Sequence, residues 1–132
     1  MSPEKSQQLM SIYPDLFDLG NECNLVTMFG FDCGDGWFDI LKECIEGIKD
    51  ELEMNPWYVD EWNSSPKVTQ IKEKYGTLSF YMTVVNDAIC DIIDRAEYKS
   101  SVICEECGKP GNIKCKSSWY ITICDECFNR NK

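Results

Sequence analysis

Residues 103–108 read "ICEECG" and residues 123–128 read "ICDECF", and this pair of phrases decides how the C-terminal end of the chain folds. Each phrase places two cysteines three positions apart, so that a single tight turn can direct both sulfurs to one point. Four thiolates at such a spacing are typical of a structural zinc site. The sequence therefore predicts one structural Zn²⁺ bound by Cys104, Cys107, Cys124 and Cys127.

Other uses of these thiols fit the sequence less well. An acidic pair lies inside each phrase, and acidic neighbours disfavour the low thiol pKa that a redox pair needs. A disulfide framework needs an oxidising compartment, whereas the chain starts without a secretory signal pattern and has nine cysteines, an odd number. Four thiolates would also fill the zinc shell and leave no position for a reactive water, so the predicted metal is structural.

The five remaining cysteines are assigned no chemistry. They are Cys23, Cys33, Cys44, Cys90 and Cys115. Cys44 falls on an apolar helical face and is interpreted as a core residue. Cys115 is flanked by lysines, which gives it the best electrostatic case for a reactive thiol or for a substitute metal ligand.

Residues 101–132 are predicted to form a separate cysteine module. Gly108 directly follows Cys107, where a knuckle needs positive φ. The segment 113–123, "IKCKSSWYITI", alternates as a short hairpin, and a helix is expected to begin at the second cysteine pair. This order of elements is typical of either a treble clef or a zinc ribbon.

Residues 1–100, called the body below, are expected to form an acidic α+β domain. Helices are predicted from about residue 3 to 13, across 37–52, where apolar residues recur every three or four positions, and from about 87 onward. A β-hairpin is predicted over 67–85 with its turn at 74–77. The fold class is therefore α+β, with helices packed on a small antiparallel sheet and a four-cysteine zinc module at the C-terminus.

The glycine-rich stretch before the second helix, "GFDCGDGWF" at 30–38, has aspartates that invite comparison with a calcium loop. Its acids do not follow the EF-hand spacing, and no glutamate closes the loop. We interpret Asp35 as a helix cap and the glycines as turn formers.

The chain is strongly acidic, with a formal net charge of −10. Such a surface repels phosphate backbones, so nucleic acid is not an expected partner. It attracts a basic protein surface, and keeping the protein in solution is the simpler alternative role.

Two groups of residues are candidates for binding. The first lies in the loop 55–66 and consists of Trp57, Tyr58, Asp60, Glu61 and Trp62, since tryptophan and tyrosine commonly anchor interfaces. Burial of some of these aromatic residues in the core is the competing interpretation. The second is a basic and aromatic group on the hairpin, Lys72, Lys74, Tyr75 and Tyr81, which would suit a small anionic ligand such as a nucleotide signal.

The sequence contains no recognisable catalytic constellation. It has no histidine, which removes the commonest general base near neutral pH, and no hydrolase or phosphate-loop motif. A non-enzymatic protein is therefore expected. No apolar run reaches the length of a membrane span and no secretory signal pattern is seen, so a cytoplasmic location is expected.

Three phrases, "CGDGWFDIL", "IKEKYGTLSFYM" and "DRAEYKSSVICEECGKPG", followed by a second Ile-Cys-x-x-Cys, resemble a family of small phage and prophage proteins without an assigned activity. The resemblance spans about Cys33 to Cys127 and implies a phage accessory protein in the cytoplasm of a host cell. The resulting hypothesis is a zinc-binding protein that engages a basic host protein, as an inhibitor or modulator of a defence or nucleic-acid-binding factor. Binding of a small anionic ligand by the hairpin is the alternative, and the oligomeric state stays open.

Overall fold

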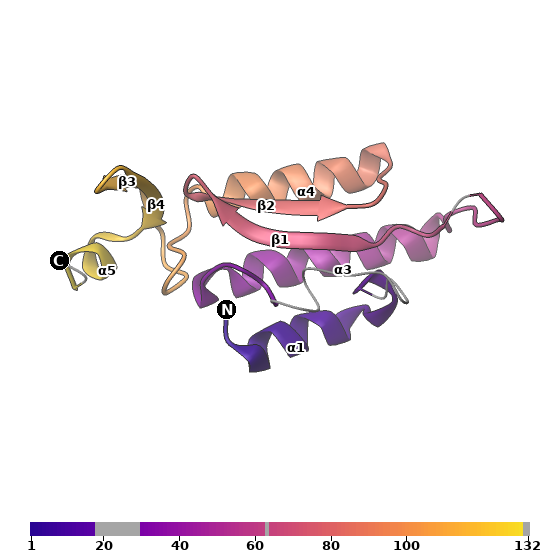
Figure 1. Ribbon diagram of the computed structural model, residues 1–132, viewed down its shortest axis with the longest axis horizontal. Coiled ribbons are helices and arrows are strands. Elements are labelled where there is room, and N and C mark those ends of the chain that lie inside the picture. The colour runs from indigo at the N-terminus through magenta and orange to yellow at the C-terminus, as the bar shows by residue number, and fades with distance from the viewer. Residues whose placement is uncertain (18–29, 63, 131–132) are drawn as a thin grey trace.

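The computed structural model describes residues 1–17, 30–62 and 64–130. Its helices are α1 (Pro3–Ile12), α3 (Phe38–Met54), α4 (Asp87–Ser100) and α5 (Asp125–Arg130), with short 3-10 helices η1 (Pro14–Phe17) and η2 (Asp35–Trp37). Its strands form two antiparallel hairpins, β1 (Val68–Lys74) with β2 (Thr77–Met82), and β3 (Asn112–Lys116) with β4 (Trp119–Ile123). The predicted α+β class is confirmed (Figure 1). Within the described ranges, no helix has the length and apolarity to cross a membrane.

Local signals in the sequence fix where the helices begin and end. The Ser2 hydroxyl accepts a hydrogen bond from the Lys5 N–H (3.3 Å), with proline at the first helical position of α1. The Asn86 side chain caps α4 by accepting from the Ile89 N–H (2.8 Å). The helix α1 stops before the Tyr13–Pro14 step, because a residue before proline is forced out of the helical region.

The body is built in layers around one apolar core. The helix α1 packs on α3, α3 packs on α4, and α4 packs on β2 (Figure 1). The stripe predicted on α3 is buried, namely Ile40, Leu41, Cys44, Ile45, Ile48 and Leu52. Gly47 lies where α3 meets α4, and a Cβ there would lie 3.3 Å from the Ile92 side chain. The small residue lets the two helices approach closely.

The β1–β2 hairpin turns where the sequence predicts. Tyr75 and Gly76 both have positive φ (55° and 89°), which is the signature of a type I′ turn. Ile71 pairs with Phe80, and both side chains are buried in the core. The prediction of strand up to residue 85 is wrong: β2 ends at Met82, because the chain leaves the hairpin to reach the Asn86 cap of α4.

The cysteine module lies at one end of the molecule, beyond the turn of the first hairpin (Figure 1). Its backbone is joined to the body by the Trp37 indole N–H, which donates to the Ile103 carbonyl (2.9 Å). The Gly36 N–H donates to the Glu105 carbonyl (2.7 Å). The Thr122 hydroxyl donates to the Gly76 carbonyl in the turn between β1 and β2. In these three hydrogen bonds between the two parts, a backbone carbonyl is the acceptor.

The glycine-rich stretch 30–38 has a different role from the one predicted. A Cβ at Gly34 would lie 2.3 Å from the Glu105 carbonyl oxygen, and one at Gly36 would lie 2.1 Å from the Cys104 carbonyl oxygen. Both glycines are therefore needed for the first cysteine turn to dock. The prediction that Asp35 caps a helix is wrong, because its carboxylate accepts from the Ser2 N–H (2.9 Å) and no side chain caps η2 or α3.

Candidate metal centre

The first cysteine pair is shaped by a tight turn that follows α4. The Cys104 N–H donates to the Lys109 carbonyl (2.7 Å), and the Gly108 N–H donates to the Cys104 carbonyl (3.0 Å). Gly108 has a φ of 83°, the left-handed conformation that glycine adopts without a steric penalty. The residue after Cys107 is thus the turn former that the sequence predicts.

The second pair begins at the end of β4 and continues into α5. The Phe128 N–H donates to the Cys124 carbonyl (3.0 Å), which opens the helix, and the Cys127 N–H points at the Cys124 sulfur (3.4 Å). The hairpin β3–β4 carries this pair back to the first.

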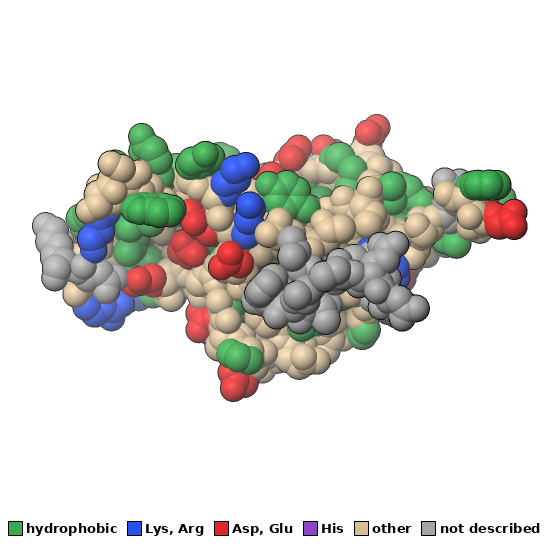
Figure 2. Space-filling model, viewed as in Figure 1, with side chains coloured by type: hydrophobic (Ala, Val, Ile, Leu, Met, Phe, Trp, Pro, Cys, Tyr) green, Lys and Arg blue, Asp and Glu red, His purple; other side chains and the backbone are tan. Residues whose placement is uncertain are grey.

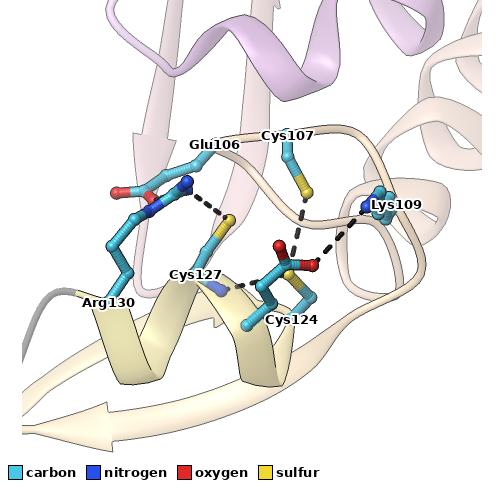
Figure 3. Close-up of polar contacts among 7 residues, drawn as sticks. Glu106, Cys107, Lys109, Cys124, Cys127 and Arg130 are labelled. Atoms are coloured by element: carbon cyan, nitrogen blue, oxygen red, sulfur yellow. Dashed lines mark hydrogen bonds and ion pairs between the residues drawn. The ribbon is translucent and has the colours of Figure 1, made fainter.

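The four sulfur atoms converge on one point. All lie within 4.8 Å of one another, and the sulfurs of Cys107 and Cys124 are 3.6 Å apart (Figure 3). Sulfurs at 2.3 Å from a tetrahedral metal would be separated by about 3.8 Å. Cys104, Cys124 and Cys127 are buried, whereas Cys107 is exposed. Within the part of the chain that the structure describes, this is the one cluster of metal-ligand side chains, and its donor set can hold a metal ion.

The pKa values of two of these thiols are shifted in opposite directions. The pKa of Cys104 is lowered to about 7. Burial alone would raise this pKa, but hydrogen bonds from the backbone N–H groups of Cys124, Cys107 and Glu106 lower it by more than burial raises it. Burial and the neighbouring thiols raise the pKa of Cys127. Four negative charges so close together repel one another, so a cation is required for all four sulfurs to ionise together.

Basic side chains surround the cluster. The Arg130 guanidinium donates to the Cys127 sulfur (3.1 Å) and lies 3.9 Å from the Glu106 carboxylate (Figure 3). Lys109 pairs with Glu126 (3.5 Å), and Lys114 pairs with Asp125 (3.1 Å). These acids lie within the cysteine phrases, so the lysines and the arginine offset part of the negative charge around the thiolates.

The other described cysteines lie away from the centre. Cys33 and Cys44 are buried in the core of the body, where burial raises the pKa of each thiol to about 12 and makes it a poor nucleophile. Cys115 is exposed on β3 and is not part of the cluster, and Cys90 is half-buried on α4. Cys23 lies outside the described residues.

The aromatic residues of the loop 55–66 have divided roles. Trp57 is half-buried and packs against the core of the body. Tyr58 is 73% exposed and Trp62 is 88% exposed, and Asp60 and Glu61 beside them are exposed as well. The loop therefore has one aromatic that holds it to the body and two that project from it.

The basic and aromatic group on the first hairpin consists of two separate lysine–tyrosine pairs. The Lys72 ammonium lies 6.0 Å from the Tyr81 ring centre, and the Lys74 ammonium lies 5.9 Å from the Tyr75 ring centre. The second of these pairs lies beside the tip of the β3–β4 hairpin, whose Trp119 and Tyr120 are exposed. No pattern in the sequence indicated this neighbourhood, because the two hairpin tips are more than forty residues apart.

The residues that attach the centre to the body were also not predicted from the sequence. These are Gly34, Gly36, Trp37, Gly76, Glu105 and Thr122. The carboxylate of Glu105 accepts from the Gly34 N–H (2.8 Å), and burial raises the pKa of this carboxyl, while the Gly34 N–H lowers it. The recurrence of glycines around Asp35 was the available signal for this contact.

No protein family model, no curated protein and no solved structure matches this chain. Its function is therefore inferred from the geometry and chemistry of the chain itself.

Proposed function

We propose that this protein is a zinc-stabilised binding protein that docks onto a basic surface of another protein and acts without catalysing a reaction. The resemblance to phage proteins suggests a host protein as the partner, in the host cytoplasm, with its defence or nucleic-acid-binding activity inhibited or modulated. Zinc is the proposed metal because the chain offers four thiolates, the commonest donor set of structural zinc.

The observation that carries the proposal is an exposed apolar tip at the end of an acidic helix. Met54, Tyr58, Val59 and Trp62 are 80%, 73%, 56% and 88% exposed. The tip projects at the end of the body opposite the cysteine module (Figure 1), and hydrophobic and acidic side chains stand out there (Figure 2). Large aromatic side chains at a protruding site are the usual anchors of protein interfaces.

The helix leading to the tip supplies the charge. An exposed acidic stripe follows α3 at spacings of three and four residues, and consists of Asp39, Glu43, Glu46, Asp50 and Glu53. Glu43 pairs with Lys99 (2.8 Å), and Glu53 lies 4.0 Å from Lys49. The other three acids form no ion pair with a described side chain, so their charge is available to steer a basic partner.

The proposal is tested by capturing partners from a host lysate on the tagged, metal-loaded protein. Trp62→Ala is expected to weaken retention of the specific partner at least about tenfold, as for an interface anchor. Trp119→Ala, at the other end of the molecule, is the matched control and should retain it. Raising salt from about 50 to about 500 mM should release the partner, because it screens the acidic stripe. If neither Trp62→Ala nor raised salt reduces the amount of partner retained, the proposal is overturned.

The identity of the metal is tested separately. Elemental analysis of the purified protein should give about one zinc per chain, with no visible absorption from iron–thiolate bonds. Iron in the site, or thiols that all react freely in the native protein, would show that zinc is the wrong metal.

A further inference from the structure

The tips of the two hairpins lie against each other and enclose a hollow that is separate from the metal centre. Its volume is about 350 Å³, and we call it the hairpin groove; it is lined by Glu73, Lys74, Tyr75, Ser118, Trp119 and Tyr120. The groove falls in the size range of small-ligand pockets. The β1–β2 turn that lines it lies at the opposite end of the body from the loop after α3 (Figure 1), so the groove is separate from the proposed protein interface.

The lining presents large aromatic side chains to solvent. Tyr75 is 74% exposed, Trp119 is 72% exposed and Tyr120 is 51% exposed. In a protein that buries Trp37 completely, three exposed rings around one hollow need an explanation. Exposed rings in a groove are platforms on which a flat ligand can stack.

Both turns hold side chains in an unfavourable backbone conformation at this site. Tyr75 has a φ of 55°, and Ser117 and Ser118 have φ values of 51° and 71°. A type I′ turn favours asparagine or glycine at these positions, and a bulky tyrosine there carries a conformational cost. Such a cost is found where a side chain must be presented for a function. The tyrosine is therefore placed at the groove at the expense of backbone preference.

Lys74 supplies a cation to the groove, whose lining also includes the carboxylate of Glu73. Lys74 lines it, and Lys72 lies two residues earlier on β1; neither forms an ion pair with a described carboxylate. The carboxylate of Glu73 accepts from the Gly76 N–H (2.9 Å) inside the turn, which ties it to the backbone. Glu73 keeps its negative charge but is held against the turn, whereas Lys74 has no ion-pair partner among the described carboxylates and can meet a phosphate.

We propose that the hairpin groove binds a nucleotide, with the base stacked on the exposed rings of Tyr75 and Trp119 and a phosphate on Lys74. Aromatic stacking combined with a nearby cation is the recognition chemistry of nucleotides and single strands. A proline-rich peptide would also suit an aromatic groove, but it gives the lysines no role. Because the remainder of the protein is strongly acidic, a free mononucleotide is repelled less than a long strand.

The test uses the full-length, metal-loaded protein and two-dimensional NMR with ¹⁵N labelling. A 5′-mononucleotide panel, adenosine, inorganic phosphate, a ten-nucleotide single strand and a decaproline peptide are each titrated to about 1 mM. A mononucleotide should shift the Trp119 indole signal and the Tyr75 and Tyr120 amides, while the Trp62 indole stays in place. Adenosine and inorganic phosphate should each bind at least about tenfold more weakly than the mononucleotide, because adenosine lacks the phosphate and inorganic phosphate lacks the base. Comparing the mononucleotides with the single strand distinguishes a free nucleotide from a unit of a strand.

Variants assign the binding to the groove. Trp119→Ala and Lys74→Ala should each weaken nucleotide binding about tenfold, and Trp62→Ala, which alters an equally exposed tryptophan, should not. Bound metal and an unchanged amide spectrum outside the groove show that each variant is folded. Binding of decaproline without nucleotides, binding of phosphate as tight as that of the nucleotide, equal loss in Trp62→Ala, or no binding at all would overturn the proposal.

Discussion

The body and the cysteine module differ in how much apolar surface they bury. The described part of the body buries a continuous apolar core that includes Trp37, Leu41, Ile48 and Phe80, whereas the buried cluster of the module consists of Ile123 and three of the candidate metal ligands. A segment with so little apolar burial cannot offset the conformational entropy of folding. Metal binding supplies the missing free energy in such small modules. One chain can thus have two regions whose stability depends on different conditions.

Loss of a metal ligand should have the largest effect, and this effect should be confined to the cysteine module. Cys124→Ser is expected to abolish metal binding and to unfold residues 101–130, while α1, α3 and α4 stay folded, because their core contains none of the ligands. Amide hydrogen exchange would show lost protection in β3, β4 and α5 but not in α1, α3 or α4. Cys115→Ser, which alters an exposed cysteine outside the cluster, should keep one metal per chain. Equal loss of protection in the body would mean that the two regions fold as one unit.

A substitution in the core of the body should weaken the body and leave the metal centre intact. Leu41 is fully buried, and Leu41→Ala should lower the free energy of unfolding by about 3 kcal/mol through lost burial and the cavity left behind. Denaturant unfolding followed by helical circular dichroism measures this loss. The folded fraction should still bind one metal per chain, as judged by elemental analysis. A loss of metal in the folded fraction would contradict independent stabilisation.

The contact between the two regions can be perturbed at a single atom. Gly36→Ala puts a Cβ 2.1 Å from the Cys104 carbonyl oxygen, so the first cysteine turn must move. We expect a loss of about 2 kcal/mol in stability, together with weaker metal binding. Gly47→Ala is the control, because its Cβ would meet only the Ile92 side chain at 3.3 Å and alanine favours the helix. Equal effects of the two substitutions would show that the contact at Gly36 is unimportant.

Much of the body could be predicted from the sequence because its signals are local. The apolar periodicity on α3, the start of α4 at Asp87 and the Tyr75–Gly76 turn each depend on a few adjacent residues. The strand prediction past Met82 failed because two local signals compete: "MTVV" has strong β propensity, but the Asn86 cap of the next helix determines where the chain turns.

The centre was predicted only in part. Spacing alone brings Cys104 near Cys107 and Cys124 near Cys127, and the four ligands follow from zinc chemistry. The fit of Gly34 and Gly36 against the first cysteine turn depends on contacts between residues about seventy positions apart. The meeting of the two hairpin tips depends on another contact between distant residues, Gly76 and Thr122, which are 46 positions apart. Such contacts leave no periodic pattern in one sequence.

A smaller change should act on the metal centre alone. Arg130 donates to the Cys127 sulfur and is largely exposed, so Arg130→Ala should weaken metal binding about tenfold without affecting the body. Competition with a chelator of known affinity measures this change. Arg95→Ala removes an exposed arginine from α4 and is the matched control. A reduction in body stability by Arg130→Ala, or an unchanged metal affinity, would contradict the assigned role.

The smallest expected effect concerns pH, on which the two regions should depend with opposite sign. Metal binding requires thiolates, so the module gains stability as pH rises. In the body, the pKa of Glu97 is raised above its ordinary value of 4.5, chiefly because the carboxyl is partly buried. The hydrogen bond that it accepts from the Phe80 N–H lowers this pKa, and the negative charge of Asp94 raises it. A carboxyl with a raised pKa in the folded state contributes most below its ordinary pKa, and this contribution is lost as pH rises through the folded value.

Glu97→Gln tests that sign because glutamine can still accept from the Phe80 N–H but does not titrate. The free energy of unfolding of the wild type, minus that of the variant, should fall as pH is raised from 4.5 toward neutrality. Denaturant unfolding at a series of pH values measures this difference. Glu97 lies on α4 and its carboxylate faces β2, away from the ligands. The pH dependence that the metal centre adds to stability is therefore the same in both proteins and cancels in the difference. A difference that rises with pH would mean that the carboxylate is stabilised in the folded body, and the proposed opposition between the two regions would then fail.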